Sequence, residues 1–151
     1  HLVVACKLEN GNWDGLIVYN VNSGKEVRRL ETTPSPAIFG AVSNDLKDVV
    51  VGTDRGEVYH LNQRNNKTEK ILQVDNKIWE IKIHPSKPII GIVELKNHAS
   101  YNFYHKNLKN NDPAVKLYTS PDDQQRFMVG CRFSSSGDHL ALWGGVFMWE
   151  H

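Results

Sequence analysis

The sequence predicts an all-β fold. Few windows of the 151-residue chain carry apolar residues at the i, i+3, i+4 and i+7 spacing of an amphipathic helix, and Asn, Gly, Ser and Pro interrupt it throughout. Short runs rich in Val, Ile, Leu, Phe and Tyr alternate instead with clusters of turn residues. Because these runs recur at a regular interval, the chain is also expected to contain a repeated unit.

Each predicted strand is a short apolar or alternating run that turn residues bound on both sides. In chain order the runs are 2–8, 16–21, 37–42, 49–53, 57–61, 70–74, 78–84, 89–95, 101–105, 114–119, 127–133, 140–143 and 146–150.

Two landmarks repeat along the chain with one period. An aromatic residue ahead of a polar one recurs at steps of 40, 45 and 45 residues, at Tyr19, Tyr59, Tyr104 and Trp149. An apolar residue followed by a polar turn, and seven positions later by the next apolar run, recurs at Val42, Ile83 and Phe133. A period of about 40 to 45 residues with four strands per unit is typical of a β-propeller blade.

The period divides the chain into approximate blades at 1–31, 32–75, 76–120 and 121–151. We label the strands of a blade a to d from the axis outward. The first segment then supplies strands b to d, the second and third supply full blades, and the fourth supplies strands a to c. This amounts to about 14 of the 28 strands in a seven-bladed ring. An open stack leaves two apolar faces bare, so we expect a longer chain, a sequence that lacks some stretches, or a partner that completes the ring.

The phrases TDRGEVYHL (53–61) and RFSSSGDHLAL (132–142), with the dipeptide Trp149-Glu150, resemble the WD-repeat family, and the resemblance covers nearly the whole chain. The family's Gly-His pair is absent, and its Trp-Asp ending reads Tyr-Asn, Tyr-His, Tyr-His and Trp-Glu. The resemblance therefore does not extend to the residues of the family's buried His–Asp network. It implies a non-catalytic scaffold whose rim binds peptides or protein loops.

No catalytic, cofactor or metal site is predicted. Asp54 precedes Arg55-Gly56 between two strands and is interpreted as a turn residue that bonds its own backbone. The run 134–137 (Ser-Ser-Ser-Gly) lacks a nucleophile elbow and is also interpreted as a turn. His60 and His105 lie one blade period apart and His84 lies in a turn between them, and equivalent positions on successive blades are too far apart to share one ion.

Two surfaces are predicted from the connections between strands. The b-to-c and d-to-a connections share one rim, the top rim, where partner-binding residues are expected at Trp13, Arg55, Asn76, Lys77, Asn97, His98, Asp122, Asp123 and Arg126. Trp13 is expected in a polar loop, as an exposed hot spot or folded over the blade. A possible basic contact surface follows the c strands, at Lys25, Arg28, Arg29, Arg64, Lys67, Lys70, Lys106 and Lys109.

The balance of 18 basic and 17 acidic residues gives no general argument for nucleic acid or membrane binding. Other protein subunits are the expected partners, and nucleic acid at the basic surface remains an alternative, as does a propeller domain attached to a serine peptidase. Cys6 and Cys131 lie in apolar runs and are expected to be buried, which fits a reducing compartment, cytoplasmic or nuclear. No run approaches the length of a membrane span, and no signal peptide is expected.

Overall fold

The computed structural model describes residues 2–7, 13–30, 37–62, 67–96, 101–120 and 128–145. Every strand of these residues pairs with antiparallel neighbours, and the chain completes one sheet before it begins the next. The predicted all-β fold is therefore confirmed.

The described residues form four sheets. The first has the described strands β1 (Leu2–Lys7), β2 (Trp13–Tyr19) and β3 (Glu26–Leu30). The second sheet consists of β4 (Ala37–Val42), β5 (Asp48–Thr53), β6 (Glu57–Asn62) and β7 (Lys67–Gln73). The third consists of β8 (Ile78–Ile83), β9 (Ile89–Leu95), β10 (Tyr101–Asn107) and β11 (Val115–Thr119). The fourth has the described strands β12 (Met128–Phe133) and β13 (Leu140–Gly145).

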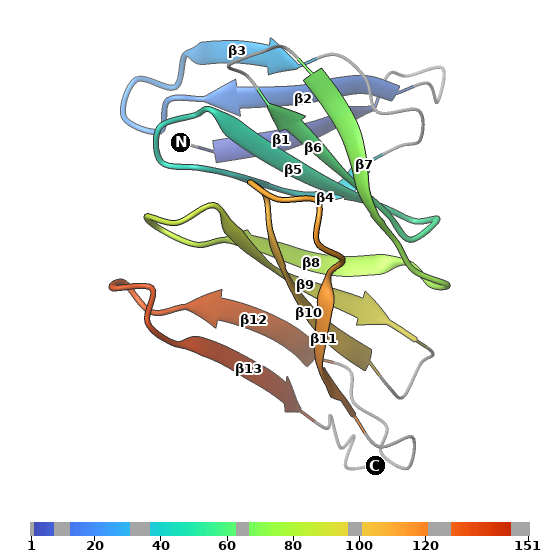
Figure 1. The fold of residues 1–151 in the computed structure, drawn as a ribbon. Coiled ribbons are helices and arrows are strands. Elements are labelled where there is room, and N and C mark those ends of the chain that lie inside the picture. The colour runs from blue at the N-terminus through green and yellow to red at the C-terminus, as the bar shows by residue number, and fades with distance from the viewer. Residues whose placement is uncertain are drawn as a thin grey trace, which may run out of the picture.

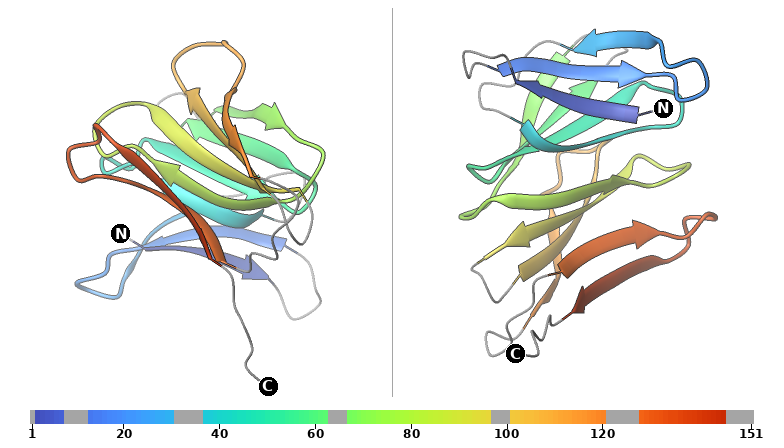
Figure 2. Two further views of the ribbon diagram at one scale, coloured as in Figure 1. Left: turned by 90° about the horizontal axis from the view of Figure 1, so that it is seen from below. Right: turned by 180° about the vertical axis from the view of Figure 1, so that it is seen from behind.

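The sheets are stacked face to face in the order of the sequence (Figure 1), and the views from below and behind show the same succession (Figure 2). Strand β8 contacts both β4 and β12, so the first strands of successive sheets adjoin one another along the inner edge of the stack. The fourth strands, β7 and β11, form the outer edges of their sheets. This arrangement places the β5–β6 and β7–β8 connections on the top rim and the β4–β5 and β8–β9 connections on the opposite, bottom rim.

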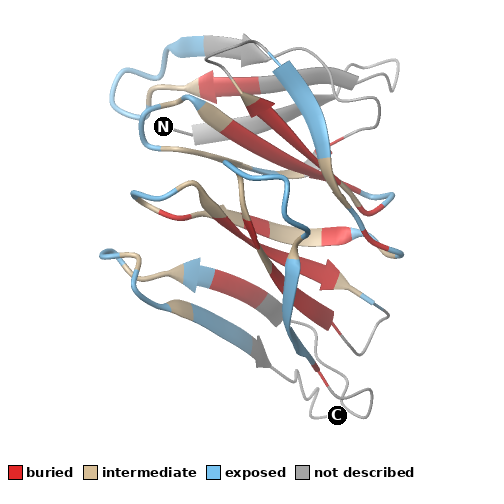
Figure 3. Ribbon diagram, in the orientation of Figure 1, coloured by how far each residue is buried: buried red, intermediate tan, exposed pale blue. Residues whose placement is uncertain are grey.

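Burial follows the position of each strand in its sheet. The middle strands β5, β6, β9 and β10 are largely buried, whereas the outer strands β7 and β11 are mostly exposed (Figure 3). Among the described side chains, those of adjacent sheets meet in three hydrophobic clusters, and the largest of these lies between the second and third sheets. A strand that is covered on both faces has a nearly continuous apolar sequence, as in DVVVGT and IIGIVEL.

Several residues singled out in the sequence belong to this core. Tyr59 and Tyr104 are 7% and 9% exposed, while Trp149 lies outside the described residues. Cys131 is fully buried and unpaired, and burial raises the pKa of its thiol to about 12, so it is a structural side chain. The side chain of Cys6 is not among those described.

Two local expectations need correction. Trp13 does not lie in a loop: it is the first residue of β2 and pairs with Lys7, because the strand extends into the polar segment beyond its apolar run. In the turn after β5, the backbone N–H groups of Arg55 and Glu57 donate to the Thr53 hydroxyl, at 3.3 and 3.2 Å, rather than to the Asp54 carboxylate.

Candidate interaction surfaces on the two rims

The top rim is held together by contacts between the β5–β6 turn and the segment that follows β7. The N–H of Val74 donates to the carbonyl of Gly56 at 3.0 Å, and the Gln73 amide donates to the carbonyl of Arg55 at 2.9 Å. Gly56 has a φ of +76°, and a Cβ there would lie 2.4 Å from the carbonyl oxygens of Val74 and Asn76. The turn therefore needs glycine, and it brings Arg55 close to the segment of Asn76 and Lys77.

Asn76 contributes to this rim as a structural residue. Its backbone N–H and its side-chain amide both donate to Glu94 Oε1, at 3.2 and 2.9 Å. The predicted partner-binding residue thus fixes the connection into the third sheet, and its half-buried amide is already used within the blade. Arg55 and Lys77, by contrast, are exposed.

Glu94 is the centre of a buried polar network in the third sheet. Its carboxylate, 2% exposed, also accepts hydrogen bonds from the Asn102 amide and the Tyr104 hydroxyl, both at 2.7 Å. The Thr119 hydroxyl donates to the Asn102 carbonyl oxygen at 2.8 Å, which extends the network to β11. Burial by itself raises the pKa of Glu94, but the bonds from Asn102, Asn76 and Tyr104 outweigh it and hold the pKa below its usual value.

An aromatic pair lies beneath Lys77 at the inner edge of the top rim. The rings of Phe39 on β4 and Trp79 on β8 are 5.9 Å apart, and the Lys77 ammonium lies 5.4 Å from the centre of the Trp79 ring. A cation over an indole face is held by the ring quadrupole, so Lys77 has a preferred position while its charge remains exposed.

The other predicted top-rim residues cannot be placed on this surface. Asn97, His98, Asp122, Asp123 and Arg126 lie outside the described residues, as does the side chain of Trp13.

The described residues of the predicted basic surface differ in their surroundings. Lys106 is 6% exposed, and its ammonium donates to the carbonyl oxygens of Asp112 and Asn110, at 2.6 and 3.4 Å, so it anchors a turn. This corrects the expectation that Lys106 is a contact residue: it lies on the sheet face that packs against the second sheet, beneath its own c-to-d turn.

The remaining basic residues of that surface differ in their surroundings. Lys67 pairs with Glu69, and Lys70 lies 3.6 Å from the Glu57 carboxylate. Lys25 and Lys109 are exposed. The side chains of Arg28, Arg29 and Arg64 are not described. Of the described members of this surface, Lys106 is buried and the others are exposed, so a nucleic-acid contact there stays a prediction.

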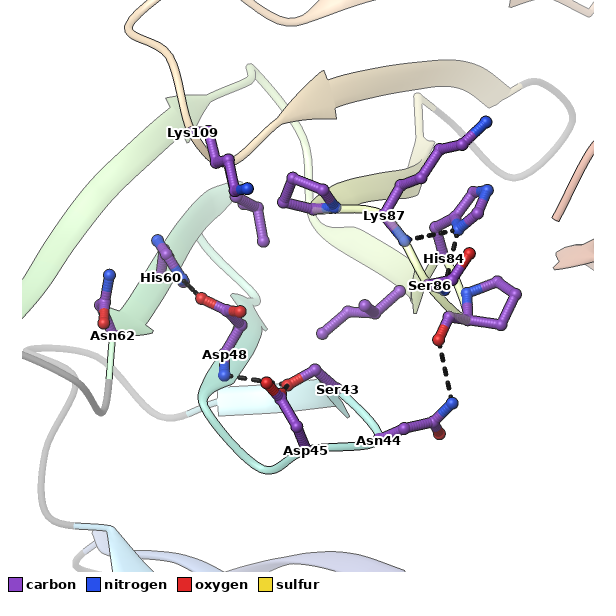
Figure 4. A pocket seen from close by; sticks show the side chains of 14 residues that line it. Ser43, Asn44, Asp45, Asp48, His60, Asn62, His84, Ser86, Lys87 and Lys109 are labelled. Carbon is purple, nitrogen blue, oxygen red and sulfur yellow. Dashed lines mark hydrogen bonds and ion pairs between the residues drawn. The ribbon is translucent and has the colours of Figure 1, made fainter.

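A groove of about 520 Å³ opens on the bottom rim between the second and third sheets. The β4–β5 and β8–β9 connections form two of its walls, and the turn that follows β10 forms a third. Figure 4 shows polar side chains around the opening, among them the paired His60 and Asp48, whose Nε2 and Oδ1 atoms are 2.9 Å apart. Lys87 and Lys109 also line it.

No group of three or more His, Cys, Asp or Glu side chains among the described residues is arranged to hold a metal ion. Nor does any helix in the described part of the chain have the length and apolarity needed to cross a membrane.

Sequence reasoning missed three residues of these surfaces: Glu94, Phe39 and Lys87. A signal existed for Glu94, because a lone carboxylate inside the apolar run IIGIVEL must be paired if the strand is buried. Phe39 and Lys87 acquire their roles from neighbours in other strands and turns, and sequence spacing alone does not show those contacts.

Comparison with protein-family models and with curated proteins finds no match. Among solved structures, the β-propeller domain of Cps50 (Swd1) from Myceliophteria thermophila is similar over 87% of this chain and 43% of that chain, with a TM-score of 0.62 and 13% identity. The tricorn protease is similar over 87% of this chain and 13% of that chain, with a TM-score of 0.63 and 14% identity. U3-55K matches 70% of this chain and 32% of its own at a TM-score of 0.47 and 13% identity, which is too weak a likeness to bear on the fold.

At these identities the similarity concerns the fold alone, and the chain spans less than half of either propeller-containing match. The stacked antiparallel sheets, the adjoining inner strands and the two structural likenesses agree with one another. The described strands form an open arc of a β-propeller.

Proposed function

We propose that this propeller is a non-catalytic scaffold that binds a protein subunit through its top rim. The observation that carries the proposal is the pair of exposed cations, Arg55 and Lys77, on connections whose backbones are fixed by hydrogen bonds to Gln73 and Glu94. Fixed connections lose little conformational entropy on binding, so contacts made there contribute more of their energy to affinity.

The chemistry of this rim favours an acidic or carbonyl-rich loop as the partner's contact. Arg55 offers a planar set of donors, and Lys77 offers an ammonium oriented by Trp79. The unpaired, buried Cys131 fits a reducing environment, so we place this interaction inside the cell.

The test uses the complete protein with the double substitution Arg55→Glu and Lys77→Glu, purified from its native cells by an affinity tag. We expect a partner recovered in near-stoichiometric amount with the unmodified protein to fall at least about tenfold, because reversal of two contact charges costs well over 1.4 kcal/mol. Quantitative mass spectrometry measures the recovery.

The matched control is Lys25→Glu with Lys67→Glu, which changes the net charge equally at exposed positions away from the top rim. It should leave recovery unchanged. Circular dichroism should show the same β-sheet content in all three proteins, and undiminished recovery with the Arg55 and Lys77 double variant would contradict the top-rim assignment.

A further inference from the structure

We propose that the bottom-rim groove between the second and third sheets is a separate binding site for an acidic peptide segment. It lies on the opposite rim from Arg55 and Lys77, so the proposal is independent of the top-rim function. Its volume of about 520 Å³ is within the usual range of ligand sites.

The walls of the groove are rigid and tied to each other. The Asn44 amide donates to the carbonyl of Pro85 at 3.0 Å, which joins the turns of the two sheets. The N–H of Leu108 donates to the carbonyl of Pro88 at 2.7 Å, which joins the two turns of the third sheet. The bond between Leu108 and Pro88 therefore connects the turn that carries Lys87 to the turn that carries Lys109.

Internal pairing leaves these two lysines as the free charges of the groove. Asp45 accepts a hydrogen bond from the Ser43 hydroxyl at 2.7 Å and lies 3.4 Å from the Lys47 ammonium, while Asp48 is bonded to His60. Neither Lys87 nor Lys109 forms an ion pair with a carboxylate of the described residues.

The Asp45 carboxylate stays ionised and stays paired. Its hydrogen bonds from Ser43 and from the backbone of Lys47, with the Lys47 charge, lower its pKa to about 2. The carboxylate therefore needs no cation from a ligand. Its pairing with Lys47 also weakens its repulsion of an anionic ligand.

The arrangement of the charges favours a peptide over a single phosphate. Figure 4 shows Lys87 and Lys109 on one side of the opening and Asp45 and Asp48 on the opposite side, with the two lysine side chains pointing in different directions. Diverging ammonium groups suit two carboxylates spaced along an extended chain. The exposed Ser86 hydroxyl, which also lines the groove, offers a further hydrogen bond to a peptide backbone.

The experiment measures fluorescence anisotropy of a labelled peptide of four Glu-Ser repeats with the complete protein. We expect saturable binding that weakens between 50 and 200 mM NaCl, as contacts between exposed charges do. The double variant Lys87→Glu with Lys109→Glu should weaken binding about tenfold or more. A peptide of four Lys-Ser repeats should not bind.

Two variants separate this site from general charge attraction and from the top rim. Lys25→Glu with Lys67→Glu changes the net charge equally at exposed residues outside the groove and should leave the affinity unchanged. Arg55→Glu with Lys77→Glu should also have no effect, so failure of the top-rim proposal and failure of this one give different results.

Four outcomes would overturn the proposal: no binding at 1 mM protein, equal loss in the groove and control variants, displacement of the peptide by inorganic phosphate at 10 mM, and stronger binding of a single-stranded oligonucleotide than of the peptide. The third would assign the groove to a free anion, and the fourth to nucleic acid. Thermal unfolding of each variant shows whether the fold is intact.

Discussion

The second and third sheets share one architecture but stabilise it with different polar groups. In the second, Tyr59 pairs with Val51, and in the third, Tyr104 pairs with Ile92, so Thr53 and Glu94, two residues beyond those partners, are equivalent. The second sheet therefore has a hydroxyl where the third has a carboxylate. On the neighbouring strand Glu57 corresponds to Asn102, so there the second sheet has the carboxylate and the third has an amide.

The exchange changes how much of the polar network is protected from water. In the second sheet, Tyr59 donates to Glu57 at 3.0 Å, and the Glu57 side chain is 16% exposed with Lys70 beside it. In the third sheet, the Glu94 carboxylate is buried and accepts four hydrogen bonds from three residues. The same backbone thus carries a partly exposed ion pair in one blade and a buried anion in the next.

This difference shows that the fold does not require one particular set of polar hydrogen bonds within a sheet. Each arrangement fixes a different connection: the Thr53 bonds hold the turn between the second and third strands of their sheet, and the Glu94 bonds hold the segment that enters the third sheet. In the second sheet, the Thr53 hydroxyl accepts the N–H groups of the turn. In the third, Glu94 accepts the N–H of Asn76 at the entering connection.

The largest expected effect is the loss of the buried anion. In the complete protein, Glu94→Ala should lower the free energy of unfolding by about 3–5 kcal/mol, because buried donors of Asn76, Asn102 and Tyr104 lose their acceptor. The equivalent carboxylate substitution, Glu57→Ala, should cost about 1 kcal/mol, since water replaces its contacts. Urea unfolding followed by circular dichroism measures both, and similar losses would erase the distinction between the sheets.

Most of the fold follows from the sequence because it depends on patterns that every blade repeats. The apolar run IIGIVEL predicts a buried strand, and the spacing from Tyr59 to Tyr104 predicts one blade. The order of the strands then follows, because consecutive strands in short-connected antiparallel sheets are neighbours.

The candidate surfaces are less predictable because they depend on side-chain contacts, made at turns and between strands, that the sequence pattern does not show. Lys106 and Lys109 look alike in the sequence, yet one ammonium is buried against the carbonyls of Asn110 and Asp112 and the other is exposed. The sequence suggests that Asn76 is a contact residue, but its amide is hydrogen-bonded to Glu94, 18 positions away. Lys77 lies above Trp79 for a similar reason, because a turn places the charge over the ring.

A smaller effect compares the two tyrosines. Tyr104→Phe should cost about 1.5–3 kcal/mol, because it removes a 2.7 Å bond to the buried Glu94 carboxylate. Tyr59→Phe should cost about 0.5–1.5 kcal/mol, because the Glu57 carboxylate retains access to water. Both rings keep their packing in these variants, so the difference in urea midpoint reports the hydroxyl groups. A larger loss at Tyr59 than at Tyr104 would contradict the comparison.

The smallest expected effect is on the dependence of stability on pH. Burial and hydrogen bonding shift the pKa of Glu94 in opposite directions, and the net shift is downward from its ordinary value of 4.5. A carboxyl group with a lowered pKa in the folded state stabilises the protein above its unfolded pKa, and this contribution is lost as the pH falls through the folded pKa. Stability should therefore decrease below pH 4.5, in part because of Glu94.

Glu94→Gln isolates that contribution, because the amide does not titrate. The variant is less stable at pH 7, since its NH2 group faces donors, so the slope below pH 4.5 is the quantity to compare. The slope should be shallower for Glu94→Gln than for the unmodified protein. An unchanged slope in Glu94→Gln would mean that the bonds from Asn76, Asn102 and Tyr104 do no more than offset the cost of burying the charge.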